Sequence, residues 1–419
     1  MVELNSCQSD CARTSECVGN VDHRRGKFGL LWILFFFHGM APGFWVPTLT
    51  NVLNAEGHGQ WVAWVFAIPP ICALISPVIG GAIADEKVAA QKMMGWSSLA
   101  AAVAIGLAYC ALDLGFGIGW FLVGIGLYAL ASGPTWGLVA TICFTHLDDR
   151  KKQFPLVRLG ATFGWMGAGF VTSYLLISDA SPISGYAAAL TRMIAGLLAF
   201  TMPNTPPMGS GKSWKSALGL NSFSLFKNRD HAVLFSVTGL FAVPLAAFYM
   251  YAPELFKDLG NKTPTASMAL AQWSEVAAMI LLGFLMVTFR LKVLLMWALG
   301  LSVLRFGLSG YAGFTEVIGW HFAGVALHGV CYTLYFVTAQ VYLDRRVPVE
   351  MRGQAQGLLS LMASGVGPLI GAFFCGWLRA VCVDENGEGW ATFWWVLAGM
   401  IAVCWVAFGV LYRGERAGS

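Results

Sequence analysis

Charged side chains are scarce in this chain. Asp, Glu, Lys and Arg make up 11% of its 419 residues, whereas 57% are apolar or aromatic; soluble globular proteins carry roughly 25% charged residues. The few charges lie in short segments between apolar runs of about 20 residues, the length that crosses roughly 30 Å of hydrocarbon as a helix. The composition therefore excludes a water-soluble protein and predicts an all-α protein with many membrane-spanning helices.

Signatures of other protein classes are absent as well. The apolar run that begins at Phe28 is too long for a signal peptide, so we expect the first span to be retained. The basic residues form no continuous surface that would follow phosphates, which argues against nucleic-acid binding. No nucleotide loop or catalytic nucleophile motif occurs, and Cys7, Cys11, Cys17 and His23 match no zinc pattern. We therefore expect no enzyme activity, no cofactor and no metal site.

The apolar runs predict twelve transmembrane helices in two halves of six. A polar stretch from Pro203 to His231 lies between the sixth and seventh runs. The predicted domains are a disordered tail over 1–27, a first half over 28–202, a central loop over 203–231, a second half over 232–412 and a C-terminal tail over 413–419. The expected spans are 28–53, 61–84, 93–112, 116–144, 154–177, 186–202, 232–252, 268–289, 291–311, 318–343, 357–381 and 390–412.

The basic residues predict how the chain is oriented. Of its 26 Lys and Arg residues, 20 fall in segments on the same side as the N-terminus and three fall on the other side. Cytoplasmic segments accumulate Lys and Arg. We therefore expect a multi-pass protein of the cytoplasmic (inner) membrane, with both termini and the central loop in the cytoplasm, embedded in the lipid bilayer as a monomer.

Polar residues within the predicted spans are candidates for a binding site, because burying them costs free energy that packing alone does not justify. On the fifth helix, Arg158, Thr162 and Trp165 are spaced i, i+4 and i+7 and share one face. They offer a cation, a hydroxyl and an aromatic ring to a polar solute that contains a ring. An Arg158 side chain that reaches the membrane surface is the alternative.

The eighth and ninth helices carry charges of opposite sign. Gln272 and Glu275 share a face of the eighth helix, and Glu275 is the best candidate for a group that takes up a proton. Arg305 on the ninth helix is expected at a similar depth, since a helix rises about 1.5 Å per residue. We therefore expect Arg305 to pair with Glu275. A static ion pair that only holds the two helices together is the alternative.

Three further places carry polar groups. On the tenth helix, His328 and Tyr332 belong to an aromatic stripe that contains one titratable ring. His38 lies at mid-depth in the first helix, where a bond to a neighbouring carbonyl is as good an explanation as solute binding. At the end of the second helix, Gly81 and Asp85 are expected to serve close helix packing and capping.

Several of these residues lie in longer stretches that are similar to one transporter family. The stretches are Phe154–Gly164, Ser213–Leu220, Leu225–Asn228, Gln272–Glu275, Leu304–Phe306 and Arg352–Gly357. With them, the chain after residue 28 resembles the nucleoside:proton symporters of the major facilitator superfamily. The resemblance implies the major facilitator fold, with a central cavity between two six-helix halves, and proton-coupled nucleoside uptake.

The resemblance also implies roles for single residues. Nucleoside binding falls to Arg158, Thr162, Gln272 and Glu275, and base stacking falls to Trp165 and Tyr332. We further expect His328 to line the same substrate site, and we expect Glu275, with or without His328, to couple protonation to binding. The chain lacks the family's polar amides over 243–249 on the seventh helix. On the tenth helix it has His328 in place of a family tyrosine and Thr333 in place of an acidic residue. Another small polar solute, such as a sugar or a modified nucleoside, therefore stays open as the substrate. A membrane sensor that transports nothing is a third hypothesis, although a larger soluble domain would then be expected.

Overall fold

The structure, a computed structural model, describes residues 27–73, 88–207, 220–348, 351–384 and 386–414. Within these ranges the chain is helical without strands, and ten helices are long and apolar enough to cross a membrane. Two shorter or more polar helices complete the predicted twelve. One is Gly59–Ala73, where a described range stops, and the other is the fifth helix, whose first turn carries Arg150 and Lys152. The predicted all-α, twelve-helix fold is confirmed.

The first half contains the first six spans. The first helix runs over 27–45 and continues after a turn as α2. The labelled elements are α2 (Leu49–Ala55), η1 (Gly59–Trp61), α3 (Val62–Ala73), α5 (Ala90–Asp113), α6 (Ile118–Ser132), α7 (Thr135–His146), α8 (Arg150–Phe170), η2 (Val171–Leu176) and α9 (Ile183–Phe200). The segments η2, and later η4 and η6, are π-helical turns within longer helices.

The second half follows a short 3₁₀ helix, η3 (Leu220–Lys227). Its elements are α11 (Arg229–Asp258), α12 (Pro264–Thr288), α13 (Leu291–Thr315), α14 (Ile318–Tyr332), η4 (Thr333–Val337), α15 (Thr338–Arg346), α16 (Arg352–Ser360), η6 (Leu361–Val366), α17 (Gly367–Cys382) and α18 (Trp390–Leu411). The seventh span is longer than expected from hydropathy. Its start is fixed by Asn228, whose side chain accepts from the backbone N–H groups of Asp230 and His231.

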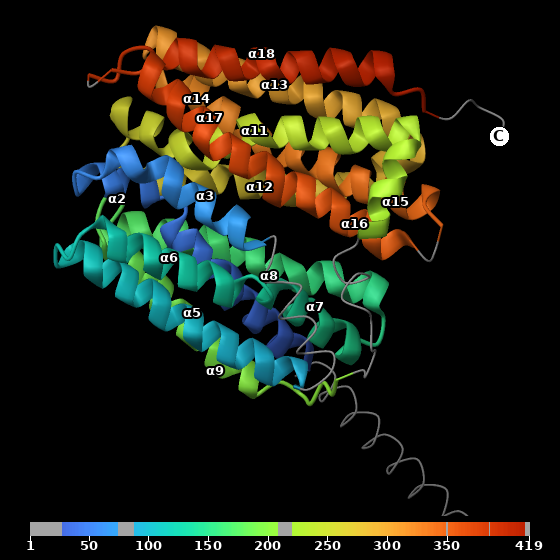
Figure 1. Ribbon diagram of the computed structural model, residues 1–419, viewed down its shortest axis with the longest axis horizontal. Helices are drawn as coiled ribbons and strands as arrows, with labels where there is room; N and C mark the ends of the chain where they lie inside the picture. Colours follow the sequence, from blue (N-terminus) through green and yellow to red (C-terminus); the bar gives the residue numbers. More distant parts are fainter. Residues whose placement is uncertain (1–26, 74–87, 208–219, 349–350, 385, 415–419) are drawn as a thin grey trace, which may run out of the picture.

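The two halves form two layers. Figure 1 shows α11 to α18 in the upper layer and α3 to α9 in the lower one. Helix α8 packs against α12, α3 against α17, and α2 against α11, so these pairs join the layers. Large apolar side chains such as Ile280 and Val287 remain 76% and 89% exposed. In a membrane these side chains face lipid.

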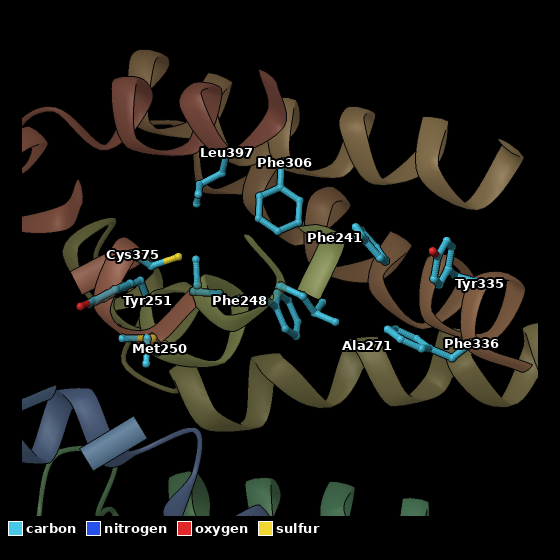
Figure 2. Close-up of a cluster of buried hydrophobic side chains, with 14 of the residues drawn as sticks. Phe241, Phe248, Met250, Tyr251, Ala271, Phe306, Tyr335, Phe336, Cys375 and Leu397 are labelled. Carbon is cyan, nitrogen blue, oxygen red and sulfur yellow. The ribbon is translucent and has the colours of Figure 1, made fainter. Parts of the chain in front are cut away.

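The core of the second half is aromatic. Figure 2 shows Phe241, Phe248, Phe306, Tyr335 and Phe336 gathered in one buried cluster around α11. Phe241 packs on both Tyr335 and Phe336, with ring centroids 5.0 and 6.1 Å apart. The hydroxyl group of Tyr335 lies 3.0 Å from the buried hydroxyl group of Thr238. Tyr335 and Phe336 are thus packing residues of the second half.

Candidate functional site

Glycine residues bring the predicted polar faces together. Gly160 and Gly164 on α8 lie against the backbone of the first helix, at Trp32 and Phe36, where a side chain would collide. On α14, Gly329 lies against the backbone of Ala271 and Glu275 on α12. Small residues allow such close approach in membranes. The first contact orients the face of α8 that carries Thr162 and Trp165, and the second sets α12 directly beside α14.

A hydrogen bond fixes the second crossing. The Gly329 N–H donates to the Ser274 hydroxyl oxygen at 3.1 Å, and that hydroxyl donates to the carbonyl of Ala271 at 2.9 Å. Gln272 and Glu275 follow on the same helix and are buried and half-buried, respectively. The side-chain oxygen of Gln272 is buried and has no hydrogen-bond partner. An unpartnered buried acceptor is costly, so this oxygen is available to a ligand.

Opposite charges meet where the halves face each other. Glu275 of the second half interacts electrostatically with Arg158 of the first half, and Tyr332 lies within reach of both charges. Arg158 is exposed in the bare protein, whereas Tyr332 is half-buried. On α8, Thr162 and Trp165 are half-buried as well. The structure thus brings together the predicted residues of α8, α12 and α14.

The predicted pairing of Arg305 with Glu275 is wrong. Arg305 is 2% exposed, and its Nη1 donates to Nδ1 of His328. Its guanidinium lies over the rings of Phe248 and Phe306, with the central carbon 4.7 and 4.5 Å from the two centroids. Nε and Nη2 have no hydrogen-bond partner. Depth in the membrane was a poor guide here, because Arg305 faces α11 and α14.

This contact defines the protonation state of His328. A guanidinium group only donates hydrogen bonds, so Nδ1 of His328 accepts and the ring proton lies on Nε2. The imidazole is therefore neutral in this state. It stacks on Phe248 with centroids 3.8 Å apart and planes 9° apart, and its Nε2 lies 3.4 Å from the Tyr249 hydroxyl oxygen. With both ring nitrogens in hydrogen bonds, His328 carries no second proton in this state.

Tyr249 on α11 is a site residue that the sequence analysis missed. Its ring lies 6.4 Å from that of Trp165 across the two halves, and its hydroxyl is within electrostatic reach of Glu275 and Tyr332. The available signal was a single hydroxyl-bearing ring in the otherwise apolar stretch 243–249.

His38 belongs to a separate pair within the first half. Its Nδ1 accepts from Nη1 of Arg192 at 2.8 Å, and Nη2 of the same guanidinium donates to the Thr135 hydroxyl at 2.7 Å. The His38 ring packs edge-on against Trp136 at 4.3 Å. All of these partners lie in the first half. His38 thus bonds an arginine, whereas a neighbouring carbonyl was one of the two predicted alternatives.

The halves are fastened at the helix ends formed by α2, the last turns of α11 and the first turn of α12, which we call the latched end. Thr50 and Asn51 donate to the carbonyls of Met250 and Pro253. The Asn54 amide donates to the Glu254 carboxylate at 2.9 Å. Arg379 on α17 holds the same carboxylate oxygen at 2.8 Å, and the Glu254 side chain is 4% exposed.

A second group of hydrogen bonds between the halves lies at the start of α12. Asp179, in the connection before α9, accepts from the backbone N–H of Thr265 at 2.8 Å. The Ser173 hydroxyl accepts from the N–H of Ala266 at 3.0 Å and donates to Asp179 at 2.9 Å. The first half therefore caps a helix of the second half. In the part of the chain that the structure describes, the five hydrogen bonds between the halves all lie at the latched end.

Some predicted features lie outside the described residues. These are Gly81 and Asp85 at the end of the second helix, the N-terminal tail with Cys7, Cys11, Cys17 and His23, and the stretch 208–219 of the central loop. The structure therefore does not address the proposed packing role of Gly81 and Asp85.

Two six-helix halves with a polar site between them define a membrane transporter of the major facilitator superfamily. The chain belongs to the nucleoside H⁺ symporter family, whose sequence profile matches residues 28–417. It is 32% identical to the putative nucleoside transporter YegT of Escherichia coli K12, over 91% of this chain and 93% of that protein. It is 25% identical to the nucleoside permease NupG of the same organism, over 91% and 95% of the two chains.

Solved structures agree on the fold. The crystal structure of nucleoside transporter NupG matches with a TM-score of 0.82 at 23% identity, over 93% of this chain and 100% of that one. The D-xylose–proton symporter matches with a TM-score of 0.69 at 17% identity, over 93% and 98% of the two chains. The homologues are transporters, and this chain is a multi-pass membrane transporter rather than an enzyme.

Proposed function

We propose that this protein takes up nucleosides together with protons by alternating access. The observation that carries the proposal is the group of side chains that meet between the halves. Arg158 and Glu275 bring opposite charges from the two halves, and Gln272 adds a buried oxygen without a partner. Trp165 and Tyr332 add aromatic surfaces. Family membership and the nucleoside permeases among the relatives support nucleosides as the substrate.

In this proposal each residue has a separate task. Arg158, Thr162 and Gln272 hydrogen-bond the ribose or the polar edge of the base, and Trp165 and Tyr332 stack on the base. Glu275 carries the proton. His328 stays neutral and contributes through its hydrogen bonds, because a second positive charge beside Arg305 would be repelled.

Alternating access has support in how the halves are joined. Among the residues that the structure describes, the five hydrogen bonds between the halves lie at one end of the molecule, and we take this end as the closed one. The distribution of Lys and Arg supports an orientation with that end outside the cell and both termini in the cytoplasm. The site is then reached from the cytoplasm, and rocking of the halves exposes it to the other side.

The deciding measurement is uptake of radiolabelled uridine and adenosine by proteoliposomes, with and without an inward proton gradient. We expect gradient-driven accumulation by the native protein. Glu275→Gln should lose accumulation but keep exchange of nucleoside across the membrane, because only proton binding is removed. Glu56→Gln, an exposed carboxyl after α2, is the matched control and should behave like the native protein. Unchanged accumulation in Glu275→Gln would remove this residue from proton coupling.

A different polar solute is the second candidate. The stretch 243–248 of α11 is apolar where the family resemblance leads us to expect amides. If another solute is accumulated and neither uridine nor adenosine competes with it, the fold and the family assignment stand, and the nucleoside proposal is wrong.

A further inference from the structure

The position of Tyr249 gives it a part in choosing the substrate. It is half-buried, it faces Trp165 from the opposite half, and its hydroxyl lies near Glu275 and Tyr332. On its other side are the rings of Phe248 and His328, with centroids 5.3 and 5.7 Å away. Tyr249 therefore connects the buried aromatic core of the second half to the group of residues between the halves.

The hydrogen bonds behind Tyr249 run in one direction. Nη1 of Arg305 donates to Nδ1 of His328, which leaves the ring proton on Nε2. That proton points to the Tyr249 oxygen, 3.4 Å away. The tyrosine oxygen accepts from His328, so the hydroxyl proton of Tyr249 is free to donate elsewhere.

The donor and acceptor roles in these two hydrogen bonds are fixed. Arginine does not lose its proton in proteins, so Arg305 always donates. His328 cannot turn, because its ring is stacked on Phe248 at 3.8 Å and the same Phe248 ring carries the Arg305 guanidinium on it at 4.7 Å. Both His328 and Arg305 are 2% exposed. Water therefore does not compete for these hydrogen bonds.

We propose that Tyr249 is a specificity-determining hydrogen-bond donor, and that it favours nucleosides whose base presents a carbonyl oxygen over those that present an amino group at the same position. The inference rests on nucleosides being the substrate. Arg305 and His328 are positioning residues, which act by keeping the tyrosine proton directed at the substrate.

The surroundings indicate that Tyr249 meets the base rather than the ribose. Its neighbours are the rings of Trp165, Phe248 and His328, which suit a flat aromatic group. The polar groups suited to ribose hydroxyls, Gln272 and Arg158, lie on α12 and α8 instead. A base carbonyl accepts the tyrosine proton, whereas an amino group leaves that proton without an acceptor.

Matched nucleosides test this inference. Inosine and adenosine differ by an oxo or an amino group on the purine, and uridine and cytidine differ in the same way on the pyrimidine. We expect the oxo member of each pair to have a KM lower by roughly tenfold, the size of one good hydrogen bond, with similar maximal rates. In Tyr249→Phe, which loses only the hydroxyl group, the two members of each pair should become equal.

The positioning role has its own readout. Arg305→Met frees the His328 proton to move to Nδ1, so the ratio of KM values within each pair should fall towards that of Tyr249→Phe. Arg305→Lys keeps a donor and should restore much of the ratio. Arg192→Met removes the equivalent arginine of the first half and is the control: it changes the amount of folded protein without changing the ratio.

The outcomes separate this inference from the proposed function. Transport of all four nucleosides with equal KM values, or a ratio that survives in Tyr249→Phe, overturns the role of Tyr249 and leaves nucleoside transport intact. Transport of none of the four by protein that is folded removes the proposed function, and this inference with it.

Discussion

Each half of the molecule buries an arginine bonded to a histidine, and the two pairs differ in what lies beyond them. In the first half, Arg192 donates to both His38 and Thr135, and its partners all belong to that half. In the second half, Arg305 donates to His328, which passes the hydrogen bond on to Tyr249 beside Trp165. A buried charge is therefore not by itself a sign of a functional site. The groups that its hydrogen-bond partner contacts are the better indication.

Among the described parts of the chain, neither arginine has a carboxylate as its partner. Isolated charges are costly to bury, and a neutral imidazole nitrogen offers one acceptor without adding a second charge. The rings of Phe248 and Phe306 add cation–π attraction to Arg305, which is worth about 2 kcal/mol when desolvated. In the first half, the Thr135 hydroxyl accepts a second hydrogen bond from Arg192. In the second half, the faces of Phe248 and Phe306 take the place of such an acceptor, and Nε and Nη2 of Arg305 have no hydrogen-bond partner.

The largest expected effect comes from removing the acceptor of either pair. His38→Leu and His328→Leu each leave a buried guanidinium without its histidine, and each should lower the free energy of unfolding by about 3 kcal/mol. Titration of the purified protein with SDS in mixed micelles measures this. A loss below about 1 kcal/mol in either variant would show that the guanidinium finds water or another acceptor.

The two halves should respond differently when the arginine is removed as well. The double variant His328→Leu with Arg305→Leu abolishes the buried charge and should regain about 2 kcal/mol relative to His328→Leu alone. The same double change at His38 and Arg192 should regain less, since Thr135 is then left without its donor. Equal recovery in the two halves, measured by the same SDS titration, would contradict the difference between the pairs.

A change at the latched end should leave both pairs untouched. Asn54→Asp places a second carboxylate beside Glu254, where like charges repel. We expect the latched end to open more often, so that a membrane-impermeant thiol reagent labels a cysteine introduced at Ala63 roughly tenfold faster, which corresponds to about 1.4 kcal/mol. Asn54→Ala should have a smaller effect. Unchanged labelling in both variants would show that this contact does not hold the halves together.

The smallest expected effect, that of Thr135→Val, distinguishes the two arginine–histidine pairs most directly. Thr135→Val removes one hydrogen bond of Arg192 and should lower stability by about 1 kcal/mol without changing the preference among nucleosides. Tyr249→Phe should do the reverse. Thermal unfolding and competition assays on the two variants, run side by side, check both statements; a shift in preference caused by Thr135→Val would show that the first pair also communicates with the substrate.

The helices were predictable from the sequence, and so was the shared face of three candidate residues on α8. The i, i+4 and i+7 spacing of Arg158, Thr162 and Trp165 is a property of one helix, and it survives in any packing of that helix. The pairing of Arg305 with Glu275 failed for the opposite reason. A rise of about 1.5 Å per residue gives the depth of each residue, but the direction in which a helix faces depends on its neighbours.

The hydrogen bonds between the halves could not be predicted from the sequence either. Asn54 and Asp179 lie at helix ends, where polar residues are ordinary, and nothing local marks them as partners of Glu254 or of the first turn of α12. Tyr249 was missed because a hydroxyl on a ring is a weak signal until the ring is seen beside Trp165 and His328.

The capping of α12 by Asp179 and Ser173 couples the latched end to the helix that carries two of the candidate site residues. The helix that is capped from across the interface also carries Gln272 and Glu275, about 10 and 15 Å further along its axis. When the latched end opens, the N–H groups of Thr265 and Ala266 lose their acceptors, which costs about 1 kcal/mol for each. In the proposed transport cycle, these two hydrogen bonds therefore favour the state in which the latched end is closed.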